Sequence, residues 1–406
     1  MKELRIGIIG TGMISHRHMC VWAKIPGVKV VAASEINEAI LRAWGEKYNI
    51  STENLYTDFR EMLKRDDLDC IDVCVHNNLH VPIAVEVMRA GFPCYSEKPM
   101  AGSYADAKTL YDAQKVFGQK LAIQISSIFS YQTRLAKSMV EEGKLGKIYH
   151  ARSVGHRREG RPGWDMPAFS KDFVNKEIGG HGPLFDLGIY HLAQMLYIMG
   201  MPELESVYGL SSADYYRDPQ RSPKGLAYEV DDLGVGLAKF KEGISMDIYE
   251  DWAMHMDDVG TSFIAGSYGG IKLIDVDTTG GRLAAEANGG QVQKPDIRFY
   301  GVEKGNQVEI TYNCQLAEFQ ETIWHPEMAV YNDNQRQWAA YVRGDLDDTT
   351  RIDTPYIAMQ TALLSEGIYI SNELGRSVTA DEIKEISKST AVRVQDTPWG
   401  KIEYNF

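Results

Sequence analysis

The chain opens on an apolar run that leads directly into a glycine turn, Leu4-Arg5-Ile6-Gly7-Ile8-Ile9-Gly10-Thr11-Gly12-Met13-Ile14-Ser15. Glycines at positions 10 and 12 let the backbone turn tightly and approach a pyrophosphate, whose charge then lies at a helix N-terminus. Ser15 replaces the third glycine of this pattern and is small enough for the helix to pack closely on the strand. We therefore predict a dinucleotide site formed by Gly10, Thr11, Gly12, Met13 and Ile14.

A second apolar strand, from Val28 to Ala33, ends at Ser34-Glu35. Glu35 lies about twenty residues after the glycine turn, where dinucleotide sites carry an acidic residue. Its carboxylate can accept hydrogen bonds from an adenosine ribose diol, but it would repel a 2′-phosphate. The sequence thus predicts NAD, with NADP disfavoured. A solvated glutamate at a strand end is the alternative.

The composition is that of an ordinary soluble globular protein. A length of 406 residues predicts two domains with a sizeable core. The net charge of -13 argues against nucleic acids and anionic membranes as partners, and is compatible with a small neutral substrate. The five cysteines lack metal-type spacing, so we expect reduced thiols and no metal site. No signal segment or membrane-spanning run is visible, and we expect a cytoplasmic protein.

Short apolar strands alternate with amphipathic helices up to about residue 125. This alternation predicts an α/β domain over residues 1–125, with a doubly wound parallel sheet. From 126 to 406 strand patterns predominate, and turns such as Lys241-Glu242-Gly243 suit hairpins. We expect a second, α+β domain with a mostly antiparallel sheet and with helices near 184–199, 327–343 and 355–372. The last of these could pack back on the first domain.

Glu97-Lys98-Pro99 follows a short strand pattern, from Pro93 to Ser96. The tripeptide is therefore expected at the carboxyl edge of the parallel sheet, where cofactors bind in open α/β folds. A partly desolvated lysine at this edge, near a positively charged nicotinamide, can exchange a proton with a substrate hydroxyl. A surface ion pair is the alternative for an isolated Glu-Lys-Pro.

A second candidate cluster runs from Gly179 to His191 and begins with a glycine-rich approach to a helix. These glycines would let the first turn approach a ligand closely. On one continuous helix Asp186 and Tyr190 share a face, whereas His191 is rotated away. Asp186 could hold a sugar hydroxyl, and Tyr190 or His191 could exchange its proton. Alternatively, Asp186 caps the helix, Tyr190 fills the core and His191 is an ordinary hydrogen-bonded residue.

Hydrogen-bond donors and an aromatic ring occur together between His156 and Asp165, which includes Arg158 and Trp164. This mixture binds a polyol through hydrogen bonds and stacking on its C–H face. An ordinary polar loop is the alternative, and the basic residues are also compatible with a carboxylated or phosphorylated substrate. Further aromatic and histidine side chains could add to the site: Trp252, His255, Trp324 and His325.

These motifs in this order resemble the Gfo/Idh/MocA oxidoreductase family over nearly the whole chain. The resemblance rests on the glycine turn, on Cys74-Val75-His76-Asn77-Asn78-Leu79-His80, on Glu97-Lys98-Pro99, on the Gly179 to His191 segment and on the closing helix before Gly375-Arg376. It implies a Rossmann domain followed by an open antiparallel sheet whose exposed face forms the interface of a homo-oligomer, a dimer, tetramer or higher.

The resemblance also implies residue roles. Lys98 would assist proton transfer and Asp186 would orient the substrate, which requires the two to meet beside the nicotinamide. The residues expected to line the cofactor near its nicotinamide ribose are Val75, His76, Asn77, His80, Glu97 and Lys98. Substrate binding is expected of Lys98, Arg158, Trp164, Asp186 and His191.

Two departures from the family pattern bear on these roles. Many members carry Asp-x-x-x-His, but here the fourth residue after Asp186 is Tyr190 and the histidine comes one later. The general base is therefore open between Lys98, Tyr190 and His191. Val75-His76-Asn77 stands where many relatives have Thr-Pro-Asn, which leaves the loop beside the nicotinamide open as well.

The resemblance predicts an NAD-dependent dehydrogenase that oxidises a secondary hydroxyl, at C3 in one subgroup, of a sugar, cyclitol or glycoside. One alternative is a glycosidase that oxidises its substrate transiently, since a keto group at C3 acidifies the neighbouring C–H and allows elimination of the group at C1. A second alternative, from another class, is a non-catalytic regulator that binds NAD.

Overall fold

The computed structural model of the chain describes residues 3–166, 169–213, 227–256, 259–274 and 296–406. The chain forms two compact units that interleave along the sequence. Unit 1 comprises residues 1–124, 333–359 and 388–406, and unit 2 comprises residues 125–332 and 360–387. Helix α13 (Thr354–Leu374), which contains the expected helix at 355–372, begins in unit 1 and ends in unit 2.

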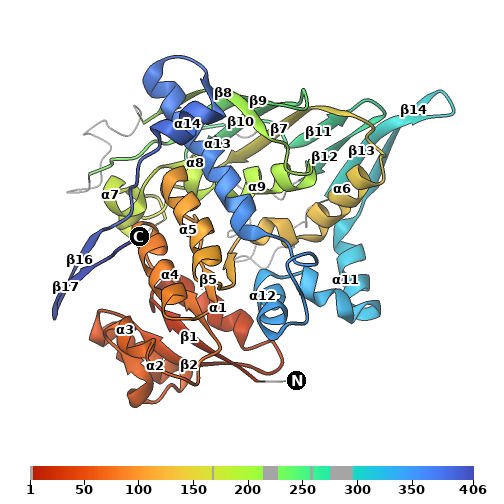
Figure 1. The fold of residues 1–406 in the computed structure, drawn as a ribbon. Helices are drawn as coiled ribbons and strands as arrows, with labels where there is room; N and C mark the ends of the chain where they lie inside the picture. The colour runs from red at the N-terminus through yellow and green to blue at the C-terminus, as the bar shows by residue number, and fades with distance from the viewer. Residues whose placement is uncertain (1–2, 167–168, 214–226, 257–258, 275–295) are drawn as a thin grey trace. The chain divides into compact units, whose positions relative to one another are not determined.

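Unit 1 is built on a six-stranded parallel sheet with the order β3-β2-β1-β4-β5-β6 (Figure 1). In sheets of this order the strand sequence reverses between β1 and β4, and ligands bind at the carboxyl ends of the strands beside that point. The predicted doubly wound α/β fold is therefore confirmed. The strands are β1 Leu4–Ile9, β2 Val28–Ser34, β3 Leu55–Tyr56, β4 Cys70–Val73, β5 Cys94–Ser96 and β6 Leu121–Ile123.

The helices of unit 1 pack large aromatic side chains against this sheet. Trp22 of α1 and Trp44 of α2 join Ile6 and Ile8 of β1 in one buried cluster. The same cluster contains Trp338 of α12, so a segment from much later in the sequence completes this core. The unit contains α1 Met13–Trp22, α2 Glu38–Tyr48, α3 Phe59–Met62, α4 His80–Arg89, α5 Tyr104–Val116, α12 Asn334–Arg343 and the hairpin β16 Val394–Thr397 with β17 Gly400–Glu403.

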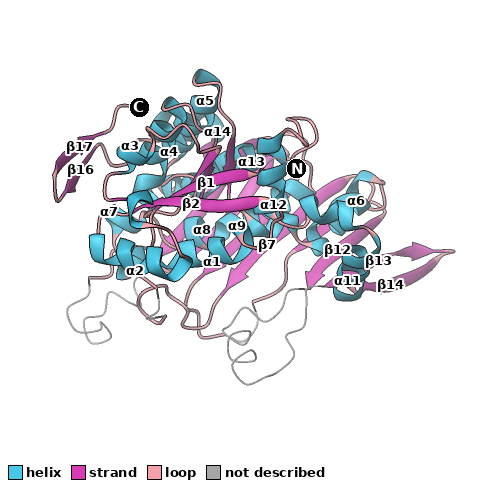
Figure 2. Ribbon diagram, turned by 90° about the horizontal axis from the view of Figure 1, so that it is seen from below, coloured by secondary structure: helices cyan, strands magenta, loops and turns pink. Residues whose placement is uncertain are grey.

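Unit 2 contains a nine-stranded, mostly antiparallel sheet with the order β14-β13-β12-β11-β7-β10-β9-β8-β15, as predicted (Figure 2). Its one parallel pair among the described strands joins β7 to β10. The hairpin of β13 and β14 projects beyond the rest of the sheet in both views (Figures 1 and 2). The strands are β7 Ile148–His156, β8 Leu204–Ser212, β9 Leu233–Phe240, β10 Ser245–Asp251, β11 Phe263–Gly266, β12 Gly269–Ile274, β13 Asp296–Glu303, β14 Asn306–Tyr312 and β15 Val378–Thr379.

Glycines on the sheet of unit 2 allow its helices to lie close to the backbone. A Cβ atom added to Gly209 or Gly236 would lie 2.6 or 2.8 Å from side-chain atoms of Ile368, on α13. The opposite face of the same strands is open, and Tyr208 and Leu237, which are paired across β8 and β9, are 45% and 55% exposed. The helices are α6 Tyr131–Glu141, α7 Lys176–Gly179, α8 Pro183–Asp186, α9 Gly188–Ile198, α11 Cys314–Trp324 and α14 Ala380–Ile386, with most of α13.

The structure differs from the predicted elements in unit 2 and in α12. The single helix expected over 184–199 consists of two helices, α8 and α9, separated by Leu187. The helix expected over 327–343 begins only at Asn334, after a 3-10 turn over Pro326–Tyr331. None of the described helices combines the length and apolar character needed to cross a membrane.

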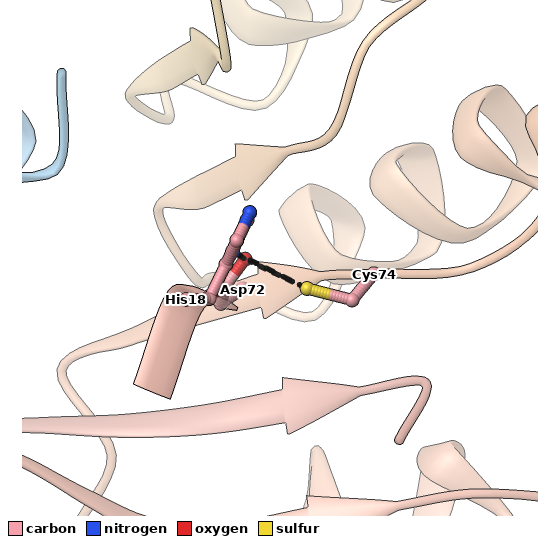
Figure 3. A group of neighbouring side chains, drawn as sticks. All are labelled: His18, Asp72 and Cys74. Carbon is pink, nitrogen blue, oxygen red and sulfur yellow. Dashed lines mark hydrogen bonds and ion pairs between the residues drawn. The ribbon is translucent and has the colours of Figure 1, made fainter. Parts of the chain in front are cut away.

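The core of unit 1 also contains a buried charged network around His18 of α1 (Figure 3). His18 Nδ1 lies 2.9 Å from Asp72 Oδ2, and its Nε2 lies 2.8 Å from Glu97 Oε1. Trp22 Nε1 donates to the same Asp72 oxygen at 2.7 Å. Burial opposes the imidazolium, but the Asp72 carboxylate raises the pKa of His18 well above its ordinary value. A charged histidine thus joins α1, β4 and the segment that leads to Lys98.

Three residues of this network, His18, Asp72 and Cys74, are of types that bind metal ions, and their ligand atoms lie within 4.8 Å of one another. Hydrogen bonds account for this proximity: Cys74 Sγ lies 3.3 Å from His18 Nδ1, and each ring nitrogen of His18 faces a carboxylate. Burial raises the pKa of the Cys74 thiol to about 12, so this cysteine is protonated. The network is therefore a structural tie between α1, β4 and the residue before Lys98.

We predict that His18→Gln destabilises the protein by about 3–5 kcal/mol, because it leaves two buried carboxylates without their cation. Because the pKa of His18 is raised on folding, its contribution is fully present below the unfolded value of about 6.5 and is lost as the pH rises through the folded value. Urea unfolding of both proteins between pH 6 and 9 measures this difference. His16→Gln on the same helix is the control, with an effect of at most about 1 kcal/mol; a difference that grows with pH would contradict the assignment.

Candidate functional site

The glycine turn of unit 1 has the geometry of a dinucleotide cradle. Gly10 has φ +90°, and a Cβ atom there would lie 2.3 Å from the carbonyl oxygen of Cys74, so only glycine fits. Gly12 is the N-cap of α1, without a side-chain hydrogen bond to the helix, and a Cβ atom built on it meets nothing within 4 Å. Open space thus lies over uncapped N–H groups, as a pyrophosphate requires.

Glu35 lies at the end of β2, beside this turn. Its Oε2 accepts a hydrogen bond from the backbone N–H of Thr11 at 3.1 Å, and its Oε1 accepts one from Asn37. Thr11 itself is buried, and its side-chain hydroxyl has no hydrogen-bond partner among the described residues. A carboxylate has further acceptor sites, so Glu35 can bind a ribose diol while it holds the turn.

The predicted nicotinamide loop follows β4 directly. Val75 is half-buried, His76 is exposed, and Asn77 begins a 3-10 turn over Asn77–Leu79 that leads into α4. His80 is buried: its Nδ1 lies 2.7 Å from the carbonyl oxygen of Pro99, and its Nε2 lies 3.1 Å from that of Val75. Burial lowers the pKa of His80. This histidine therefore links the β4 loop to the Lys98-Pro99 segment.

Lys98 is half-buried and follows Glu97, which extends from β5. Glu97 Oε2 accepts a hydrogen bond from the backbone N–H of Lys98 at 2.9 Å, while its Oε1 faces His18. Burial acts to raise the pKa of Glu97, but the bond from His18 holds it below its ordinary value. Two buried histidines, His18 and His80, thus fix the backbone on either side of Lys98.

In unit 2, Asp186 ends the short helix α8 and is buried. Two of the glycines before it, Gly179 and Gly182, lie against backbone of unit 2. A Cβ atom on Gly182 would lie 2.0 Å from the carbonyl oxygen of Asp231, and one on Gly179 would lie 2.6 Å from backbone oxygens of Asp172 and Phe173. These glycines therefore allow the chain to pack against its own backbone.

His191 on α9 forms a dyad with a carboxylate that the sequence analysis did not identify. Its Nδ1 lies 3.0 Å from Glu250 Oε2, on β10. Glu250 is fully buried, and burial raises the pKa of this carboxyl. A Cβ atom on Gly155 of the neighbouring β7 would lie 2.0 Å from Glu250 Oε2 and 2.2 Å from His191 Nδ1. A glycine in the middle of a strand pair thus makes room for the dyad.

Tyr190 is half-buried, and its backbone carbonyl accepts a hydrogen bond from Ser127 Oγ at 2.7 Å. Its backbone N–H bonds to the carbonyl of Leu187, so the turn between Asp186 and Tyr190 departs from the continuous α-helix that we expected. Tyr190 and His191 lie in the first turn of α9, whereas Asp186 ends α8.

Trp164 and Arg158, the predicted substrate-binding pair, lie in different surroundings. Arg158 is exposed, whereas Trp164 packs edge-on against Tyr228 with ring centroids 5.1 Å apart. The guanidinium group beside Trp164 belongs to Arg161, which is buried and lies 5.5 Å from the indole centroid. Arg161 Nη2 also donates to Asp165 Oδ1 at 2.7 Å. The cation beside Trp164 is therefore Arg161, and the predicted substrate roles of Arg158 and Trp164 stay predictions.

The residues that sequence reasoning missed had recognisable signals. Met246 and Ile248 of β10 point into the core, and Glu250 is the next residue in this alternation. The strand pattern therefore places an acid on the buried face. Gly155 is an isolated glycine within a strand, which often marks a close approach by another group. His18 lies on the buried face of α1 with Ser15 and Trp22.

Two protein-family models match this chain, one in its N-terminal part and one in its C-terminal part. Residues 4–124 match the model of the Gfo/Idh/MocA oxidoreductase family described as an NAD-binding Rossmann fold, and residues 133–272 match the model of the Gfo/Idh/MocA C-terminal domain. The two matches together span more than half of the chain.

Individual relatives are similar over shorter stretches. D-glucoside 3-dehydrogenase from Escherichia coli is 31% identical over 207 residues, which is 51% of this chain and 57% of that protein. A glycosyl hydrolase family 109 protein from Parabacteroides distasonis is 29% identical over 156 residues, 36% of this chain and 34% of that protein. The chain thus matches about half the length of the first relative and about a third of the length of the second.

A solved structure of a levoglucosan dehydrogenase, in complex with NADH and levoglucosan, has the same fold. It superimposes with a TM-score of 0.72 at 20% identity, and the match covers 93% of this chain and 100% of that one. With both family models matched and this fold shared, the chain belongs to the Gfo/Idh/MocA family of oxidoreductases, and its first domain is an NAD-binding Rossmann domain.

Proposed function

We propose that this protein is an NAD-dependent dehydrogenase that oxidises a secondary hydroxyl group, at C3, of a sugar or glycoside. The observation that supports it most directly is the open cradle over Gly12 beside the Glu35 carboxylate, in a family of oxidoreductases. The name of one relative, D-glucoside 3-dehydrogenase, favours a glycoside and C3. The proposed reaction gives a ketone, NADH and a proton, with hydride leaving the carbinol carbon for the nicotinamide.

The proposed cofactor residues follow from the geometry of unit 1. Gly10, Thr11, Gly12, Met13 and Ile14 would hold the pyrophosphate, and the Glu35 carboxylate would bind the adenosine ribose and disfavour NADP. Residues at the ends of β4 and β5 would lie beside the nicotinamide: Val75, His76, Asn77, His80, Glu97 and Lys98. Because His18 and His80 hold this backbone rigidly, the loop would keep its shape when the cofactor leaves.

Among the three candidate bases, the dyad geometry favours His191. A proton taken from the substrate hydroxyl converts His191 into an imidazolium, and the buried Glu250 carboxylate stabilises that charge and fixes the ring. Asp186 would orient the hydroxyl, Lys98 would supply a positive charge to the developing alkoxide, and Tyr190 would add a further hydrogen bond. Arg158 and Trp164 would contact the rest of the substrate.

A glycosidase that acts through transient oxidation is the second candidate, favoured by the similarity to the family 109 glycosyl hydrolase. The ketone formed at C3 would acidify the neighbouring C–H, and a base would then expel the group at C1. Water would add to C1 of the resulting enone, and the final reduction would return hydride from NADH to C3. Release of free aglycone without net formation of NADH distinguishes this reaction from the dehydrogenase.

We predict that Gly12→Ala raises the dissociation constant of NADH about tenfold or more while the protein keeps its melting temperature. The added methyl group projects into open space in the folded chain, at the place where the pyrophosphate approaches. Titration of NADH fluorescence measures the affinity. Val116→Ala, at an exposed position of α5, is the control, and unchanged NADH affinity in Gly12→Ala would contradict the cradle.

We predict that Lys98→Met and Asp186→Asn each lower kcat by about 10²–10⁴-fold with NADH affinity retained, since each removes a group that acts on the substrate hydroxyl. The assay follows NADH absorbance with methyl β-D-glucoside, levoglucosan and myo-inositol, and mass spectrometry detects the loss of two hydrogens. Lys108→Met, at an exposed position of α5, is the control.

The same assay identifies the base. His191→Gln should show the larger loss and should remove the rise of kcat with pH, whereas Tyr190→Phe should retain that rise. The opposite pattern would assign the base to Tyr190. Wild-type protein that binds NADH but oxidises no polyol would refute the dehydrogenase and favour the regulator.

We also propose that the open face of the unit 2 sheet mediates homo-oligomerisation. Tyr208 and Leu210 of β8 lie opposite Leu237 and Val235 of β9, and together they expose an apolar patch. Burial of this patch against a second copy would remove apolar surface from water.

We propose that the protein is located in the cytoplasm, because its cysteines are free thiols and that compartment keeps thiols reduced.

The double variant Tyr208→Lys with Leu237→Lys should shift the protein to a smaller assembly at equal concentration, because two buried charges would oppose the contact. Light scattering coupled to size-exclusion chromatography measures the mass. Val116→Lys, at an exposed apolar position of α5, should leave the mass unchanged. A monomeric wild type would contradict the proposed interface.

A further inference from the structure

Asp232 Oδ2 and Trp252 Nε1 of unit 2 are among the buried polar atoms that have no hydrogen-bond partner within the described residues. Asp232 is 5% exposed and Trp252 is 0% exposed. An acceptor and a donor that are both buried without partners lower stability, and natural proteins retain such groups where a ligand or water completes them. The two atoms have opposite roles, because an indole N–H only donates whereas a carboxylate accepts.

The strand register places these two side chains together. Asp251 pairs with Leu233 at the end of the β9–β10 ladder, and the backbone N–H of Trp252 donates to the carbonyl of Asp232 at 3.0 Å. Trp252 therefore stands opposite Asp232, and opposite residues in an antiparallel pair project on the same face of the sheet. Glu250, two residues back along β10, shares this face. Asp232 and Trp252 thus lie on the same face as the Glu250 carboxylate, which binds His191.

The segment that carries Asp186 packs against the same place. Gly182, at the start of α8, approaches the carbonyl of Asp231 so closely that a Cβ atom would lie 2.0 Å from it. Leu187, directly after Asp186, belongs to the same buried cluster as Trp252, and Trp164 packs against that cluster. Asp232 and Trp252 are therefore neighbours of the candidate substrate residues of unit 2.

The surrounding chemistry favours a neutral polyol over an anion. Tyr228 donates its hydroxyl to Asp232 Oδ1, which leaves Oδ2 available. Burial raises the pKa of Asp232 to about 7 and also raises that of its buried neighbour Asp251. A bound carboxylate or phosphate would place a further negative charge beside two acids whose burial already disfavours their own ionisation, and the guanidinium of Arg161 is already bound to Asp165. Aromatic rings with a buried acid and an indole donor are suited to hydroxyl groups on a C–H framework.

We propose that Asp232 and Trp252 form a second hydroxyl-binding subsite, in which one hydroxyl of a neutral sugar donates to Asp232 Oδ2 and a neighbouring hydroxyl accepts from Trp252 Nε1. The inference rests on the proposed function and deepens it: the subsite would select a substrate by hydroxyl groups other than the one that is oxidised. The reacting hydroxyl remains with Asp186 and the base, so Asp232 and Trp252 govern binding and specificity.

The test uses Asp232→Asn, which keeps the size of the side chain and replaces an acceptor by a donor, and Trp252→Phe, which removes the N–H. Calorimetric titration of the NADH-bound protein with methyl β-D-glucoside and with levoglucosan measures affinity for each probe. Each variant should bind at least one probe about tenfold to a hundredfold more weakly than the wild type. Asp247→Asn, on the opposite face of β10, and Trp399→Phe, at an exposed position, are the matched controls and should bind as the wild type does.

Deoxy analogues of the glucoside identify the hydroxyl concerned. One monodeoxy analogue should bind the wild type about tenfold more weakly than its parent, and Asp232→Asn should lose this preference. If Trp252→Phe unfolds, the isosteric Asp232→Asn alone decides.

The outcomes separate this inference from the proposed function. A folded Asp232→Asn that binds every probe and analogue as the wild type does would overturn the subsite and leave water as the partner of Oδ2. Wild-type turnover with that result would preserve the dehydrogenase. Binding that depends on Asp232 in a protein that oxidises no probe would support the subsite and refute the dehydrogenase. Failure of the wild type to bind any neutral probe would overturn both.

Discussion

The His18 imidazolium, held between the carboxylates of Asp72 and Glu97, is the interaction on which the cofactor side of this protein depends. Three segments converge on it: the helix that follows the glycine turn, the strand β4, and the residue before Lys98. A buried charge is tolerated only with a partner and hydrogen bonds, and here each ring nitrogen of His18 has one. The same ion pairs therefore stabilise the core and fix the geometry of the loop at the sheet edge.

Unit 2 also contains a buried acid, Glu250, and a glycine on the neighbouring strand makes room for it. Glu250 lies on the core face of β10, and it forms an ion pair with the ring of His191. Gly155 on the neighbouring strand leaves the volume that the carboxylate and the imidazole occupy. A β-strand weakened by glycine is the cost of this arrangement. In both units, then, a histidine and a buried acid fix residues that the sequence marks as functional.

The placement of polar groups on one sheet face also connects the two proposals for unit 2. Alternation along β10 directs Glu250 and Trp252 to the same side, and cross-strand pairing adds Asp232. A base supported by Glu250 and a binding pair formed by Asp232 and Trp252 would therefore share one surface. Such an arrangement would let binding of distant hydroxyls orient the one that reacts, since positioning on a rigid element is an effective contribution to catalysis.

Local patterns in the sequence were sufficient for many elements. The strand expected from Val28 to Ala33 corresponds to β2, and the helix expected over 355–372 lies within α13, because apolar periodicity acts over a few positions. The hairpin of β13 and β14 was missed, although Lys304-Gly305, both with positive φ, is a typical tight-turn signal. The helix break at Leu187 was also missed, because a helical pattern alone does not show where tertiary packing interrupts a helix.

The sequence by itself determined the class of the fold and the residues of the glycine turn, because strand periodicity and the need for positive φ at Gly10 are properties of short segments. Only the tertiary structure decided which partners surround these residues. It paired His18 with Asp72 and Glu97, His191 with Glu250, and Trp252 with Asp232, over separations of 20 to 79 positions. Such pairings follow from strand register and helix packing, and these are settled by the whole core and not by any one stretch of the chain.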